Sequence, residues 1–208
     1  MKQAISVSIG KKATFSMSRV SRIGVIAEDT TDYHAIRILT QRIIGAHQIG
    51  FRSKNANGCT KIRSKSATWA IDLKRRGCDM LLIVHDQDDR NYDDLKAELN
   101  TKLKSSPIPN YYVCIPVEEI EAWFLADGAA VKKALGLKRA PKIKGFPETI
   151  KSPKEFLHSQ IAHCSDNEIY FSPAQNQLIA EHVNIDTLIS RCPSFRDFHT
   201  FVSSHDYR

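Results

Sequence analysis

The sequence contains no apolar run close to the ~20 residues that a membrane-spanning helix needs. Its first twelve residues lack the continuous apolar core of a secretion signal. The five cysteines form neither a CxxC pair nor a zinc-like spacing, which disfavours a disulfide or zinc framework. We therefore expect a cytoplasmic chain that does not enter a membrane and keeps its thiols reduced.

Two phosphate-binding motifs are also missing from the sequence. Neither a Walker-type GxxxxGK[ST] loop nor a GxGxxG turn occurs, so we do not expect this chain to hydrolyse nucleotides by itself. No motif around a serine or a cysteine supports nucleophilic catalysis either. Any catalytic chemistry should therefore come from other side chains.

The overall composition is that of an ordinary globular protein. Of the 208 residues, 42% are hydrophobic and 25% are charged. The 30 Lys and Arg residues outnumber the 23 Asp and Glu residues, which gives a net charge of +7. A positive balance of this size favours a polyanionic partner without proving one.

Short β-rich apolar runs alternate with helical patterns over most of the chain. Residues 20–28, 79–84 and 110–117 are typical of buried strands, and 46–63 are expected to be irregular. Apolar residues recur at helical spacing in segments 29–46, 65–77, 92–104 and 118–136. This alternation predicts an α/β fold with a mostly parallel sheet and helices on both faces.

The chain divides into three parts by composition. Residues 1–19 are predicted to form an N-terminal arm or an extra strand, and 20–137 to form the α/β core. Residues 138–208 begin with a basic, proline-punctuated loop and continue with helical patterns, so they are predicted to form a C-terminal extension.

Acidic residues follow two of the predicted strands. The first strand ends at Glu28, and the second delivers Asp86 and Asp88, whose side chains point the same way in an extended chain. Ligands of parallel sheets bind beyond the carboxyl ends of the strands. Crowded carboxylates there would suit Mg²⁺ or Mn²⁺, since these cations prefer oxygen ligands. The alternative is that the acids are helix caps in solvated loops.

Two further glutamates follow the third predicted strand. Glu118 and Glu121 are three residues apart, so on a helix they would share a face and could complete a metal site. The alternative is an acidic first turn that the helix dipole favours. His85 is adjacent to the aspartates and is a candidate for proton transfer.

These motifs, taken in order, resemble a known kind of domain. A glutamate after the first strand and Asp-x-Asp after a later one resemble the TOPRIM domain of topoisomerases, primases and OLD-family nucleases. The longer series of motifs resembles a bacterial TOPRIM-like family catalogued as domain of unknown function 4276. Its motifs in this chain are IAEDTTDYHAI, LLIVHDQDD, IPVEEIEAWFLAD, FPETIKSPKEFL and RCPSFRDF.

The resemblance spans roughly residues 20–201 and implies roles for particular residues. Glu28, Asp86 and Asp88 match the TOPRIM acids by position. Asp29 stands where TOPRIM proteins usually have glycine. Members of the family often occur beside an ABC- or AAA-type ATPase in phage-defence operons, so such an ATPase is an expected partner.

Two basic runs could hold nucleic acid beside the acids. Residues 52–76 contain eight Lys or Arg residues and one acid, and 132–154 repeat this ratio. Lysines and arginines that contact a nucleic-acid backbone release counterions and so raise affinity. The alternative is a solvated charged surface. The residues predicted to contact nucleic acid are Arg63, Lys65, Arg75, Arg76, Lys142 and Lys144.

Three functions remain open on the sequence. The first is a Mg²⁺- or Mn²⁺-dependent TOPRIM-type nuclease in which Glu28 acts as acid/base or ligand and the aspartates hold metal. The second is a non-catalytic module that binds nucleic acid or a partner ATPase. The third is a small-molecule phosphotransfer enzyme or phosphatase. The oligomeric state is also open, so a homo-oligomer is kept as an alternative.

Overall fold

The computed structural model describes residues 19–45, 48–165, 172 and 174–208. The predicted N-terminal arm, apart from residue 19, lies outside these residues. Four strands form one sheet in the order β2-β1-β3-β4, and every neighbouring pair is parallel. The strands are β1 (Arg22–Ala27), β2 (Gly50–Asn55), β3 (Met80–Val84) and β4 (Asn110–Cys114). The predicted α/β class with a parallel sheet is confirmed.

Strand β2 lies in the segment that was expected to be irregular, so that expectation is wrong. Of its six residues only Phe51 is buried, because β2 is an edge strand that pairs with β1 alone. A strand with one buried apolar side chain has almost no hydrophobic pattern to detect. Helix α2 (Cys59–Arg75) also begins six residues earlier than its apolar spacing indicates.

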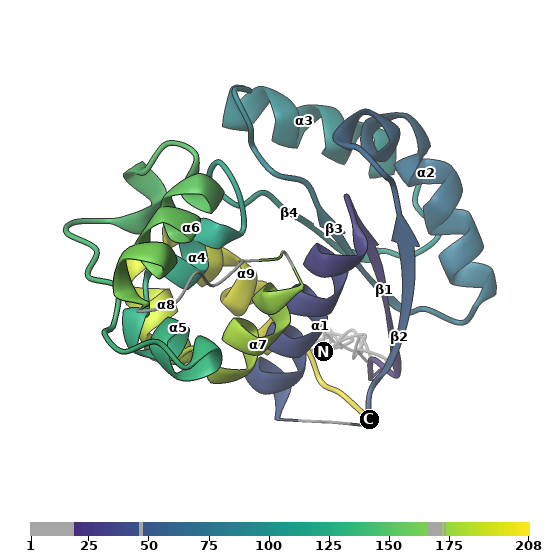
Figure 1. Cartoon of the computed structure of the whole chain (residues 1–208). Helices are drawn as coiled ribbons and strands as arrows, with labels where there is room; N and C mark the ends of the chain where they lie inside the picture. The colour runs from purple at the N-terminus through teal and green to yellow at the C-terminus, as the bar shows by residue number, and fades with distance from the viewer. Residues whose placement is uncertain (1–18, 46–47, 166–171, 173) are drawn as a thin grey trace, which may run out of the picture.

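Helices cover both faces of the sheet, as predicted (Figure 1). Helices α2 and α3 (Tyr92–Leu103) lie on one face, and α1 (Thr30–Ile44) and α9 (Pro193–Ser203) lie on the other with the remaining helices behind them. The remaining helices are α4 (Glu121–Leu125), α5 (Gly128–Leu135), the 3-10 helix η1 (Pro147–Thr149), α6 (Pro153–Cys164), α7 (Gln175–His182) and α8 (Ile185–Arg191).

The alternation of side chains along β3 divides the apolar interior in two. Leu81 and Ile83 pack with the side chains of α2 and α3, whereas Leu82 and Val84 pack with those of α1 and the C-terminal helices. Successive residues of a strand point to opposite faces, so one five-residue strand contributes to both cores. This alternation also fixes the direction of the side chains that follow β3.

The C-terminal helices share the larger core with the sheet. Trp123 of α4 is fully buried and stacks on Phe198 of α9, and its indole N–H donates to Ser194 Oγ at 2.8 Å. Tyr112 of β4 stacks on Phe201 of the same helix. Aromatic contacts of this kind therefore connect the predicted core to the predicted extension.

The described helices include none that is both long enough and apolar enough to cross a membrane.

Removal of the Phe198 side chain should destabilise the whole protein. Because Phe198 is fully buried, Phe198→Ala is expected to lower the free energy of unfolding by about 3–5 kcal/mol. The matched control is Phe146→Ala, whose side chain is 61% exposed, and it should change stability by less than about 0.5 kcal/mol. Chemical denaturation followed by tryptophan fluorescence measures both. Equal losses in the two variants would contradict this account of the core.

Candidate functional site

An acidic pocket lies at the carboxyl edge of the sheet. Strand β1 is flanked by β2 on one side and by β3 on the other, so the chain order reverses direction between β1 and β3. Such a switch point is where open parallel sheets bind their ligands. The pocket has a volume of about 130 Å³. Seven of its lining residues are acidic: Glu28, Asp29, Asp32, Asp86, Asp88, Glu119 and Glu121.

We call this cavity the acid pocket, and it contains four of the acids selected from the sequence. Glu28 follows β1, Asp86 and Asp88 follow β3, and Glu121 begins α4. Asp86 and Asp88 both line the pocket, but not because they alternate along an extended strand. Asp88 has φ +49°, so the chain has left the extended conformation by that residue.

Glu118 lies beside the acid pocket and not among its lining residues. The expectation that Glu118 and Glu121 share a helix face is wrong, because α4 begins at Glu121 and Glu118 has φ +59° in the preceding turn. Glu118 instead lines a neighbouring hollow of about 200 Å³, together with Asp88 and Glu119. These two residues also line the acid pocket, so the two hollows adjoin.

Three lining acids were not selected from the sequence. Asp29 is the N-cap of α1 and accepts hydrogen bonds from the backbone N–H groups of Thr31 and Asp32 at 2.6 and 3.0 Å. Its φ of −136° is extended, so no glycine is required at this position. Asp32, only 8% exposed, and Glu119 also face the pocket. The sequence signal for Asp32 was its place in the first helical turn after Glu28.

The most buried acids of the pocket favour their neutral forms. Burial, together with the carboxylates of Asp32 and Glu121, raises the pKa of Asp86 well above its usual range. Burial and the charge of Asp29 raise the pKa of Asp32 to about 8. The Oδ1 atom of Asp86 is buried and has no hydrogen-bond partner. A buried oxygen of this kind lacks the compensation that buried polar atoms normally have.

Two of the three glutamates of the pocket, Glu28 and Glu121, have raised pKa values that hydrogen bonds partly offset. Burial raises the pKa of Glu28, with Asp88 adding to the effect, whereas the backbone N–H of Cys59 at the start of α2 lowers it. Glu121 is 4% exposed, and burial raises its pKa. The Asn176 amide partly opposes this shift by donating to Glu121 Oε1 at 3.0 Å.

Lys154 is the one cationic residue in the part of the pocket lining that the structure describes. Burial alone would lower the pKa of its ammonium group, but Glu121, Glu119 and the two aspartates of α1's start outweigh burial and raise it. Its backbone N–H donates to Glu119 Oε2 at 3.0 Å. Lys154 therefore supplies a single positive charge against seven acids.

The donor chemistry of the acid pocket fits a hard divalent cation. Carboxylate oxygens are the ligands that Mg²⁺ and Mn²⁺ prefer, and the buried, unpartnered Asp86 Oδ1 offers one such oxygen. Among the described residues, however, no three His, Cys, Asp or Glu side chains stand grouped as a finished metal site. Cation binding would therefore have to draw the side chains inward.

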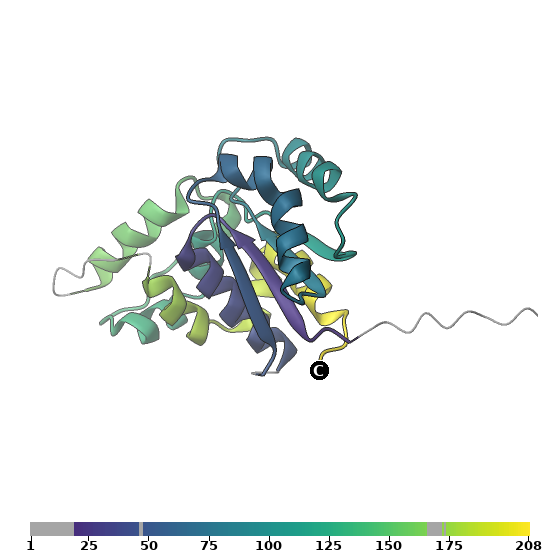
Figure 2. The ribbon, with the colours of Figure 1, turned by 90° about the vertical axis from the view of Figure 1, so that its right-hand side faces the viewer.

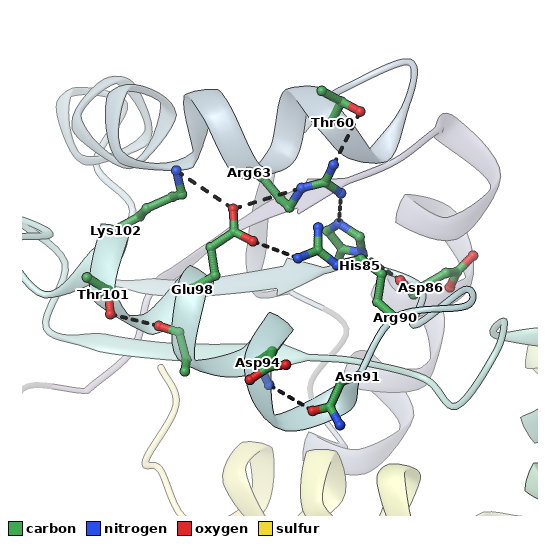
Figure 3. A network of polar contacts seen from close by, with 11 residues as sticks. Thr60, Arg63, His85, Asp86, Arg90, Asn91, Asp94, Glu98, Thr101 and Lys102 are labelled. Carbon is green, nitrogen blue, oxygen red and sulfur yellow. Dashed lines mark hydrogen bonds and ion pairs between the residues drawn. The ribbon is translucent and has the colours of Figure 1, made fainter.

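His85 contacts Arg63 of α2 (Figure 3) and is not among the described lining residues of the acid pocket. Its Nε2 accepts a hydrogen bond from Arg63 Nη1 at 3.2 Å, because a guanidinium can only donate, and its Nδ1 lies 2.6 Å from the Asp86 carbonyl oxygen. Burial lowers the pKa of this imidazole. The Asp86 carboxylate points away from the ring, so His85 is placed to hold Arg63 and not to reach the acids.

The basic residues selected from the sequence fall into separate regions. Arg63 takes part in the His85 contact and lies 3.9 Å from Glu98, whereas Lys65 is exposed. Arg75 and Arg76 are at the far end of α2, about 24 Å along the helix from Cys59. Lys142 lines a different cavity, described below, and Lys144 is exposed on the same loop.

The fold and the pocket define a parallel α/β protein with an acidic pocket at the carboxyl edge of its sheet. Residues 25–203 match a protein-family model described as "Domain of unknown function (DUF4276)", and the chain belongs to this family. The match runs from β1 to the end of α9. Comparisons with curated proteins and with solved structures gave no match.

The raised acid pKa values should make the metal-free protein less stable as the pH rises. The folded protein keeps a proton on Asp32 up to about pH 8, whereas the unfolded chain releases it near 3.8. Stability from this group is therefore complete below about pH 4 and is lost as the pH rises through 8. The melting temperature in EDTA should fall between pH 5 and pH 8.

Asp32→Asn should flatten this fall, because the amide does not titrate. Asp93→Asn, at an exposed position in α3, is the matched control and should keep the wild-type slope. A wild-type melting temperature that is constant or rises from pH 5 to pH 8 would contradict the assignment.

Proposed function

We propose that this protein is a TOPRIM-type nuclease that hydrolyses phosphodiester bonds with Mg²⁺ or Mn²⁺. The observation that carries the proposal is the acid pocket at the β1–β3 switch point, with seven carboxylates and one lysine. Two of the acids, Asp32 and Asp86, have strongly raised pKa values because they are buried beside other carboxylates. Such a cluster in a cleft is typical of a functional site.

In this proposal the residues of the pocket have three roles: cation binding, proton transfer and contact with the phosphate. Asp86, Asp88 and Glu121 would hold the cation, and Glu119 lines the same pocket. A bound divalent cation would activate water and neutralise charge on the phosphate. Glu28 is half-buried, and burial raises its pKa, so it is suited to accept or deliver a proton. Lys154 is positioned to contact a phosphate oxygen.

The rest of the chain favours a polyanionic substrate over a small phosphate ester. Its net charge of +7 exists despite the acid cluster, so the remainder of the surface is more basic still. A positive surface around an acidic centre attracts nucleic acid to the carboxylates that would otherwise repel it. The family resemblance extends the proposal to a bacterial anti-phage system with an ABC- or AAA-type ATPase partner.

One observation favours the alternative, a non-catalytic module that binds nucleic acid or the ATPase. The described acids do not stand as a finished metal site. A binding module would need the basic surfaces and the fold, and no metal-dependent turnover. Cleavage assays separate the two functions directly.

Metal-dependent cleavage should require the acids of the pocket. We expect wild type to cleave labelled DNA or RNA with Mn²⁺ or Mg²⁺ and to stop in EDTA. Asp86→Asn and Glu28→Gln should each lose at least about 10–100-fold in rate. Asp89→Asn, at an exposed residue next to Asp88 and outside the acid pocket, should keep the wild-type rate. Binding without cleavage in wild type would favour the module.

Glu121→Gln separates a metal ligand from a structural acid. The glutamine keeps the oxygen that accepts from Asn176 and removes the charge. Its melting temperature in EDTA at pH 8 should equal or exceed that of wild type, because carboxylate repulsion is relieved. The extra stabilisation by Mn²⁺ should shrink. A loss of metal affinity of about 10–100-fold reduces the free energy that Mn²⁺ binding adds to the folded state. A lower metal-free melting temperature with undiminished stabilisation by Mn²⁺ would make Glu121 structural.

A further inference from the structure

A second, larger cavity lies away from the acid pocket. It has a volume of about 510 Å³ and is formed by α5, the loop after it and the last turn of α6. Four of its lining residues are cationic: Lys132, Lys138, Arg139 and Lys142. His163 and Cys164 of α6 complete one wall, and the described lining contains no acid. We call it the basic pocket.

The negative end of α6 does not cancel this positive charge. Carboxyl ends of helices carry a partial negative charge, and α6 ends at the wall of the basic pocket. Arg139 covers that end: its Nη2 donates to the His163 carbonyl at 2.8 Å and its backbone N–H to the Cys164 carbonyl at 3.4 Å. The remaining N–H groups of a guanidinium are free to turn toward an anion.

The loop that carries these cations is fixed along its length. At Gly128 a Cβ atom would collide with the carbonyl oxygen of Pro141, so the loop lies directly on the start of α5. Arg191 then donates to the carbonyl oxygens of Ile143 and Gly145 at 3.2 and 2.8 Å. Cations on a loop held in this way lose less conformational entropy on binding a ligand.

Helix α6 sets the distance between the two pockets. Lys154 in its first turn lines the acid pocket, and His163 in its last turn lines the basic pocket. The two residues are nine positions apart, which corresponds to about 14 Å of helix. Figure 2 shows α6, in light green, running away from the sheet. Adjacent phosphates of one strand lie closer together than this, so the two pockets would take phosphates that are not adjacent.

We propose that the basic pocket binds a backbone phosphate of a nucleic acid, on the same strand as the phosphate at the acid pocket and not adjacent to it. This inference rests on the proposed function, because it takes the acid pocket as the site of cleavage. It adds a second anchoring point on the same strand and a minimum substrate length. The cavity is wide enough for a phosphate and its sugar, and its charge is opposite to theirs.

The test compares two double variants that remove equal charge. Lys132→Ala/Lys142→Ala removes two lining residues, and Lys104→Ala/Lys133→Ala removes two exposed lysines, at the end of α3 and in α5, that do not line the pocket. The probes are fluorescent oligothymidylates of two and twelve nucleotides. All binding is measured with Mn²⁺ in proteins that also carry Glu28→Gln, so that the acid pocket can hold its cation while cleavage is slowed. Thymidine monophosphate serves as a competitor.

Loss of the lining lysines should weaken binding of the 12-mer about tenfold at low salt. It should flatten the slope of log K against log salt by about 1.4, which is 0.7 for each lost contact on a single strand. The control variant should stay within about threefold of wild type, because solvent-exposed charges off the binding path contribute little. The dinucleotide has one internucleotide phosphate, which the cation in the acid pocket should bind, so it should bind all three proteins alike.

Three results would overturn the inference. One is equal loss of 12-mer affinity in the two double variants. Another is equal loss for the dinucleotide and the 12-mer. The third is displacement of the 12-mer by thymidine monophosphate at matching concentration, which would make the pocket a site for a small anion. None of these outcomes depends on turnover: wild type that fails to cleave with Mn²⁺ removes the nuclease and leaves the binding result standing.

Discussion

The burial of several carboxylates in one pocket is the constraint on which the structure of this sheet edge depends. Parallel strands bring the residues after β1 and β3 to one edge, and burial there raises the pKa values of Asp86 and Asp32. The starts of two helices partly offset the negative charge, since Asp29 caps the start of α1 and the first N–H of α2 contacts Glu28. Protons, Lys154 or a bound cation must neutralise the remainder. The pocket therefore favours ligands of one sign of charge.

The same edge concentrates the backbone strain of the described chain. Its non-glycine residues with positive φ are Asn57, Asp88, Glu118 and Ser152. Three of them line the hollow that adjoins the acid pocket, and Asn57 donates its backbone N–H to the carbonyl of Glu28 at 2.8 Å. Each such residue costs about 1–3 kcal/mol, and the rest of the fold must hold it. The two apolar cores on either side of β3 supply that support.

The sequence was informative where a hydrophobic run determines a boundary. Glu28 and Asp86 could be selected because each follows a buried strand, whereas Glu119 depends on the turn before α4, which no periodicity reveals. Edge strand β2 was missed because one buried residue makes no pattern. His85 is different, because strand alternation already predicts that His85 and Asp86 point to opposite faces of the sheet.

The contact between Gly128 and Pro141 limits how this protein can evolve. No side chain fits at position 128 without displacing the loop that carries Lys138, Arg139 and Lys142. Selection on the basic pocket therefore acts partly through a residue that has no charge and touches no ligand. Lysines can exchange with arginines on this loop while the charge is kept, but the glycine beneath it has no substitute. Drift across the family should spare that position even where the cations themselves vary.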